Sequence, residues 1–276
     1  MLGAACTIGS AECRTRQAQR RGPMAQRHVV QRLHPTLADV LSQLDGTPLG
    51  RALNDRAVEL ATSQVLGDPI DRSAALAGHR WLLERADGDG LPLTAAGYLK
   101  PAAVRELAAV LPTMHDWPFG LAKEVDAHPL LHFHGYLKSI GLLRRYKGTL
   151  RLTKAGRAAQ QDPALLWQHL ADALVSSDSP FEETTGVVML VHAATSADDI
   201  DVDVVARTMA ELGWRVDDGS SVERRDVYPV WNQLWDALGN VGAPVTRSVM
   251  DRALSPAARA LVADALFKIV ENEAHG

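Results

Sequence analysis

Residues 138–157 read KSIGLLRRYKGTLRLTKAGR, and this stretch decides the fold expected for the middle of the chain. In its second half, Leu150 and Leu152 alternate with polar neighbours after the dipeptide Lys147-Gly148. Alternation of this kind next to a very short glycine-containing turn predicts a two-stranded β-hairpin. Thr153 follows the second expected strand and is a suitable N-cap for another helix.

The residues before the hairpin carry helical signals. Prolines at first-turn positions and apolar residues at helical spacing predict a helix over 101–111 and a short second helix over 117–125. A third helix is expected over 128–140, with His128 as its cap and Gly141 at its end. Helix, short helix, helix and two-stranded wing is the element order of a winged helix-turn-helix.

The segments 141–145 and 148–157 resemble the end of winged-helix regulators. In those proteins glycine-leucine, a basic strand, a turn, a second strand and leucine-threonine-x-x-glycine follow one another. The resemblance implies that the third helix lies in the major groove of DNA and the wing lies near the phosphate backbone. On that frame the side chains that face outward from the third helix are Lys138, Ser139, Tyr136 and either His132 or His134.

Basic residues concentrate in the same stretch. Residues 138–157 contain seven cations and no acid. Because duplex DNA is a dense row of negative charge, a compact group of cations gains affinity by releasing counterions. We therefore predict a non-enzymatic protein that binds double-stranded DNA, in regulation or in a mobile-element context. The residues predicted to bind nucleic acid are Lys138, Arg144, Arg145, Lys147, Arg151, Lys154 and Arg157.

The distribution of charge leaves a second interpretation open. The range 94–170 contains 10 basic and 5 acidic residues, whereas 171–276 contains 8 basic and 18 acidic residues. The acidic last third could pair with the basic stretch, within one chain or in a homodimer, and mask it from nucleic acid. Because winged helices also serve as docking modules, a protein-interaction or dimerisation module is the alternative function.

The rest of the chain divides into further regions. Residues 1–34 read as a basic arm, either disordered or preceding a later start at Met24, and residues 35–93 read as a helical region. Residues 94–170 are the winged-helix-like unit, and residues 171–276 are an acidic second unit of the same kind. The expected fold is mainly α, with tandem winged-helix-like units and short β-hairpin wings. This arrangement resembles uncharacterised actinobacterial proteins, some of which are fused to a transposon-passenger-like module.

The second unit repeats the signals of the first in weaker form. Helical stripes are expected over 201–213 and 227–241, and a strand is expected over 240–243. Trp231 and Trp235 lie four residues apart in the second stripe, which favours core packing over a ligand cage.

Two clusters of potential metal ligands fit structural roles better. His128, His132 and His134 do not share one helical face with Glu124, so no metal site is expected there. Aspartates 198, 199, 201 and 203 precede a helix, where acids favour the macrodipole, and they lack the glycine and glutamate of a calcium loop.

Several function classes are excluded. No phosphate-loop, dinucleotide-binding or nucleophile-elbow motif occurs, so we expect no cofactor and no enzymatic activity. The two cysteines, Cys6 and Cys13, cannot form a four-cysteine zinc site, and they favour a cytoplasmic protein with incidental thiols. No apolar run is long enough to span a bilayer, so no membrane partner is expected.

Overall fold

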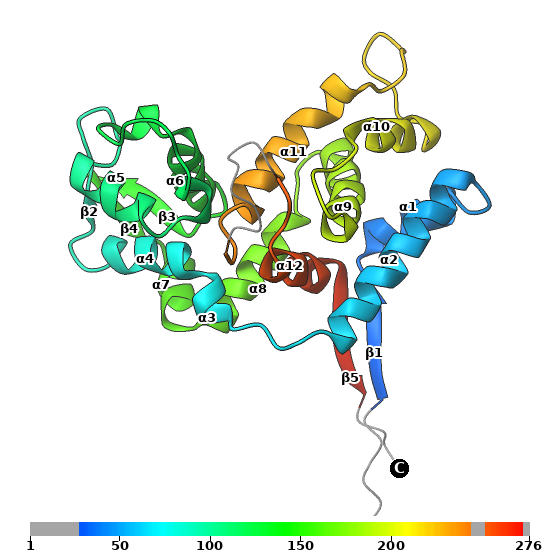
Figure 1. Cartoon of the computed structure of the whole chain (residues 1–276), viewed down its shortest axis with the longest axis horizontal. Coiled ribbons are helices and arrows are strands. Elements are labelled where there is room, and N and C mark those ends of the chain that lie inside the picture. Colours follow the sequence, from blue (N-terminus) through cyan, green and yellow to red (C-terminus); the bar gives the residue numbers. More distant parts are fainter. Residues whose placement is uncertain (1–27, 244–251, 273–276) are drawn as a thin grey trace, which may run out of the picture. The chain divides into compact units, whose positions relative to one another are not determined.

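The computed structural model describes residues 28–243 and 252–272, and this part of the chain is mainly α-helical with short antiparallel sheets (Figure 1). The expected fold class, mainly α with short hairpins, is therefore confirmed. The predictions at Cys6, Cys13 and Met24 lie outside the described residues. None of the described helices combines the length and the apolar character needed to cross a membrane.

The chain divides into two compact units. The smaller one comprises residues 1–31 and 269–276, and its described residues, 28–31 and 269–272, belong to the paired strands β1 (His28–Leu33) and β5 (Phe267–Asn272). Residues 28–33 of the arm expected to be disordered form β1, and the alternative of a later start at Met24 stays a prediction. The backbone groups of β1 find partners on a strand from the far end of the chain, a pairing that local sequence patterns do not reveal.

The helices α1 (Pro35–Gln43) and α2 (Pro48–Leu66) belong to the larger unit, 32–268, and to the region expected to be helical, and each has a proline in its first turn. Thr47 caps α2 by accepting the N–H of Gly50 at 3.0 Å. Both helices pack against α9 (Pro180–Thr195), in which every residue from Thr185 to Ala194 is buried. A helix that is apolar on all sides belongs at the centre of a core, and α9 has that place here.

The middle of the larger unit contains the expected hairpin. Asp71 caps α3, and within the region expected to be helical the helix is interrupted after Ala75 and resumes as α4. The elements of this part are α3 (Arg72–Ala75), α4 (Ala77–Ala86), β2 (Leu91–Pro92), α5 (Pro101–Ala108), η1 (Pro112–Met114), η2 (Glu124–Asp126), α6 (His128–Ser139), β3 (Leu143–Tyr146), β4 (Thr149–Leu152) and α7 (Lys154–Gln161).

The short helix expected over 117–125 is not formed. The chain is irregular from Trp117 to Lys123 and makes only the 3-10 turn η2 afterwards. A helix this short is marginal by itself, and Gly120 in its interior would cost about 1 kcal/mol more. Tertiary contacts of Glu124, described below, hold the segment in another conformation.

The helices that follow α7 include α8 (Pro163–Leu174), α10 (Val202–Glu211), α11 (Arg224–Leu238) and α12 (Pro256–Leu266). Of these, α10, α11 and α12 pack against α9, and α8 packs against α12. The two predicted helical stripes correspond to α10 and α11, and Trp231 is fully buried, as expected for core packing. Residues 240–243 do not form the strand expected for a second wing, and 244–251 lie outside the described residues.

Candidate nucleic-acid interface

The predicted hairpin is present and belongs to a three-stranded antiparallel sheet with the strand order β2-β4-β3. Strands β3 and β4 are joined by the two residues Lys147 and Gly148, whose φ angles are +46° and +76°. Positive φ at both central residues is the type I′ turn that matches the twist of a two-residue hairpin. The third strand, β2, lies before Thr94, the residue at which the winged-helix-like unit is expected to begin. The sheet that contains the hairpin therefore includes residues from the preceding region.

The turn from α6 into the hairpin is fixed by Gly141. Its N–H donates to the carbonyl of Lys138, and the N–H of Leu142 donates to the carbonyl of Leu137, both at 3.1 Å. This pair of bonds is a Schellman motif, which needs a left-handed residue, and Gly141 has φ +76°. The predicted end of the third helix at Gly141 is therefore confirmed, and the Schellman motif is the structure that ends it.

Three cations of the predicted set surround one exposed tyrosine. Tyr146 is 42% exposed, and the charged groups of Arg144, Lys147 and Arg151 lie 5.5, 5.3 and 5.6 Å from the centre of its ring. Arg144 is directly opposite Arg151 in the strand register, so both side chains lie on the face of the hairpin that carries Tyr146. We call these four residues the wing cluster.

The wing cluster holds like charges close together. Arg151 is fixed by two bonds, from Nε to Oγ1 of Thr149 at 3.2 Å and from Nη2 to the carbonyl of Asp89 at 3.0 Å. Like charges directly opposite one another in a sheet are destabilising, and the tyrosine face between them compensates only in part. An anion lying against the cluster would relieve this repulsion.

Arg145 is on the other face of the hairpin. Its Nη2 donates to the carbonyl of Ala95 at 3.2 Å, and its guanidinium lies so close to Gly97 that an added Cβ would clash with Nη1. The structure therefore does not place Arg145 with the wing cluster. The fixed position of its guanidinium depends on a glycine with φ +94°.

The remaining three predicted cations lie on helices. Lys138 is in the last turn of α6, and Lys154 and Arg157 are in α7, all with exposed side chains. The start of α7 is tied to the end of α6 because Oγ1 of Thr153 donates to the carbonyl of Gly141 at 2.6 Å. The predicted capping of α7 by Thr153 is confirmed, since the same hydroxyl accepts the N–H of Gly156.

The acidic last third does not neutralise these cations in the part of the chain that the structure describes. Within 28–243 and 252–272, none of the seven predicted cations forms a salt bridge with an acidic side chain. Pairing between two copies of the chain stays a prediction.

The outward face expected for α6 is partly wrong. His134 is buried, and its Nδ1 lies 2.8 Å from Oε1 of Glu124. The hydroxyl of Tyr136 is also buried, and burial raises its pKa. His134 is covered by Glu124 of η2, whereas α11 packs against another part of α6, where Nδ1 of His132 lies 3.2 Å from Oδ1 of Asp236. The side chain of His132 is still 53% exposed.

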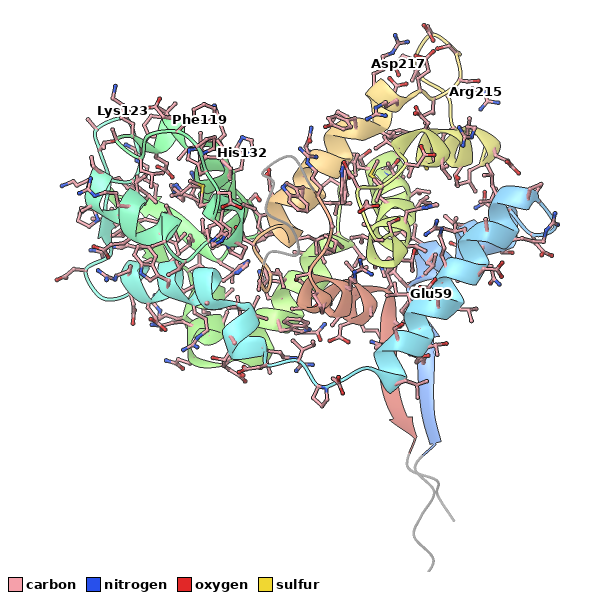
Figure 2. The ribbon with its side chains drawn as sticks, viewed as in Figure 1. Glu59, Phe119, Lys123, His132, Arg215 and Asp217 are labelled. Carbon is pink, nitrogen blue, oxygen red and sulfur yellow. The ribbon has the colours of Figure 1, made fainter. Side chains whose placement is uncertain are left out.

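Glu124 and the histidines of α6 make contacts within the protein. Glu124 pairs with His134 and also accepts the N–H of Leu99 through its other oxygen, whereas His132 faces Asp236. Figure 2 labels His132 on α6 together with Phe119 and Lys123 on the loop that precedes this helix. The described residues contain no group of three or more side chains able to hold a metal ion. The Glu124–His134 pair joins two segments ten residues apart, and no local pattern signals it.

The run of aspartates before α10 has the expected structural role. Asp201 caps α10 by accepting the N–H groups of Asp203 and Val204. Asp199 accepts a hydrogen bond from Nε1 of Trp231 at 3.1 Å. These bonds account for the cluster as helix capping and core anchoring.

Comparisons with known proteins identify one matching segment. Residues 71–165 match a family model described as the Y4jL N-terminal domain. No curated protein and no solved structure matches the chain. The matching segment begins at the cap of α3 and includes every element through α7, so the wing cluster and α6 belong to one segment similar to that family domain.

Proposed function

We propose that this protein binds double-stranded DNA without enzymatic chemistry, and that the wing cluster makes the principal contact. The observation that carries the proposal is the arrangement of Arg144, Lys147 and Arg151 around the exposed Tyr146. Arginine is suited to phosphate because its fork of donors and its charge act together. Around the hairpin, α5, α6 and the two strands follow one another in the order of a winged helix, with the 3-10 turns η1 and η2 in place of its short second helix.

The proposed contact is to the phosphate backbone rather than to base edges. In winged-helix proteins the third helix enters the major groove, but α11 lies across the corresponding face of α6 here. Phosphate contacts position a protein on the duplex and carry no sequence information. We therefore expect binding that depends strongly on salt and weakly on sequence.

The test is a titration of random-sequence duplexes over a range of salt concentrations. Three to six phosphate contacts predict a slope of log K against log salt between about −2.7 and about −5.4. Duplexes of different base composition are expected to compete about equally. A slope near zero would remove the proposal, and strong preference for one sequence would show that α6 is released from α11.

A protein-interaction module stays the alternative, and one observation favours it. Phe119 is 65% exposed and stacks edge-on against Trp117 at 5.2 Å, in the loop between α5 and α6 (Figure 2). Exposed aromatic side chains are enriched where proteins associate. If the alternative holds, Phe119→Ser will abolish self-association in sedimentation experiments. If the chain is a monomer at all concentrations, homodimerisation is excluded.

A further inference from the structure

A cavity of about 690 Å³ lies between α6, the α8–α9 connection and α11. This volume is within the range of sites that bind small organic molecules. Its apolar wall includes Leu131, Leu174, Val230 and Leu234. The cavity has no part in the proposed DNA contact, since no residue of the wing cluster lines it.

The charged groups of the cavity are predominantly acidic. Glu182, Glu183 and Asp236 line it, and neither lysine nor arginine does. No salt bridge to Glu182 or Glu183 is present among the described residues. The only basic side chain in the lining is His132, which faces Asp236.

The carboxylates are held by neutral hydroxyl donors. Glu182 accepts a bond from Oγ of Ser177 at 3.0 Å, and Glu183 accepts one from Oγ1 of Thr36. Burial raises the pKa of Asp236, and the nearby His132 and Arg252 oppose that shift only in part. Glu182 is exposed and Glu183 is half-buried, and within the described residues neither forms a salt bridge with a lysine or arginine. A bound cation would therefore be attracted by both carboxylates without displacing a cationic partner.

A further polar group of the lining lacks a partner. Tyr136 belongs to the wall formed by α6, and its buried hydroxyl has no hydrogen-bond partner among the described residues. Buried tyrosine hydroxyls are normally satisfied, so an orphaned one beside a cavity indicates a place where a ligand can donate or accept a hydrogen bond.

We propose that this cavity binds a small organic cation, a protonated amine carried on an apolar body. The amine is recognised by the carboxylates of Glu182, Glu183 and Asp236, and the body packs against the leucine and valine side chains. An anion of the same shape is excluded by those carboxylates, and a neutral molecule gains only the apolar contact. The site is independent of the proposed DNA contact.

The experiment compares matched probes in the full chain by calorimetry. Octylamine, phenylpropylamine and adamantylmethylamine are each titrated beside the alcohol of the same carbon skeleton. We expect at least one amine to bind about tenfold or more tightly than its alcohol, and phenylpropanoate not to bind. The proposal is overturned if no amine binds in the millimolar range, or if the alcohols bind as tightly as the amines.

Variants of residues that line the cavity test whether the amine binds there. The double variant Glu182→Gln and Asp236→Asn is expected to weaken amine binding about tenfold or more, while Asp217→Asn, in the loop between α10 and α11, leaves it unchanged. Gly135 lines the cavity and an added Cβ would meet nothing within 4 Å, so Gly135→Leu fills the cavity while α6 keeps its structure. Undiminished amine binding by folded Gly135→Leu would place the ligand elsewhere and overturn the assignment.

The amine test is separable from the DNA test. Arg144→Gln with Lys147→Asn alters only the wing cluster, so this variant is expected to keep amine binding. If the natural chain does not bind DNA, the proposed function is refuted and the cavity assignment is unaffected. If none of the amines binds, the cavity assignment is refuted and the proposed function is unaffected.

Discussion

Nδ1 of His134 on α6 lies 2.8 Å from Oε1 of Glu124 on η2, and both side chains are buried. The second carboxylate oxygen of Glu124 accepts the N–H of Leu99. One carboxylate thus joins the irregular segment before α6, the helix itself and the chain that follows β2. This contact replaces the short helix expected over 117–125 and holds α6 in place beside the hairpin.

Removal of the Glu124 carboxylate is expected to destabilise the protein. Glu124→Ala leaves the ring of His134 and the N–H of Leu99 without their partner, which predicts a loss of about 3 kcal/mol in the free energy of unfolding. Asp126→Ala, at an exposed position of the same 3-10 turn, is expected to change it by less than about 0.5 kcal/mol. Urea unfolding measures both, and equal losses would show that the pair has no special role.

The protein is expected to lose stability in mild acid. Burial lowers the pKa of His79 from 6.5 to about 3, and burial with the nearby Arg56 lowers the pKa of His192 to about 4. Between these values and 6.5 the unfolded chain binds protons that the folded chain does not, so stability falls as the pH falls. The expected loss between pH 7 and pH 5 is about 2 kcal/mol for each histidine.

A substitution at His79 tests that pH dependence. His79 has no hydrogen-bond partner among the described residues and packs edge-on against Phe133 at 4.8 Å, so His79→Leu keeps an apolar contact. Urea titrations of this variant at the two pH values are expected to give a loss smaller by about 2 kcal/mol than that of the natural chain. An unchanged loss would mean that His79 is protonated in the folded protein.

Two glycines of α6 and its cap are expected to respond oppositely to alanine. Gly135 lies inside the helix with open space at its Cβ position, so Gly135→Ala should raise the free energy of unfolding by about 0.5–1 kcal/mol. Gly141 has φ +76°, where a side chain is strained, so Gly141→Ala should lower it by about 1 kcal/mol. Thermal and urea unfolding compare the two, and changes of the same sign would contradict the described cap.

Substitutions at Lys147 test the charge of the hairpin turn separately from its stability. Asparagine tolerates positive φ better than lysine, so Lys147→Asn is expected to leave the hairpin as stable or slightly more stable. The same change removes one phosphate contact and should make the salt slope shallower by about 0.9. Lys147→Val is the contrasting variant, because a β-branched residue at this φ destabilises the turn while removing the same charge.

Much of this fold is predictable because its elements have local signals. Pro48, Asp71, Thr153 and Asp201 mark helix starts through fixed φ or capping, and Lys147-Gly148 specifies the hairpin turn. Each signal acts within four residues of itself, which is the range over which a single sequence can be interpreted.

The errors concern contacts between distant segments. The pairing of β1 with β5, the Glu124–His134 pair and the packing of α11 on α6 are all tertiary. The predicted cations form a continuous stretch of the sequence. Because side chains alternate along a strand, Arg144 and Arg145 lie on opposite faces of the hairpin. The stretch of cations therefore predicts which part of the chain forms the site, but not which of its cations lie together.

The salt dependence of DNA binding by a wing-cluster variant tests the central claim most directly. Arg144→Gln with Lys147→Asn removes two cations beside Tyr146, and Arg215→Gln with Arg225→Gln removes two exposed cations near α11 as the matched control. We predict that the wing-cluster variant makes the slope of log K against log salt shallower by about 1.8, while the control keeps the slope of the natural chain. Equal slopes for all three proteins would contradict DNA binding through the wing cluster.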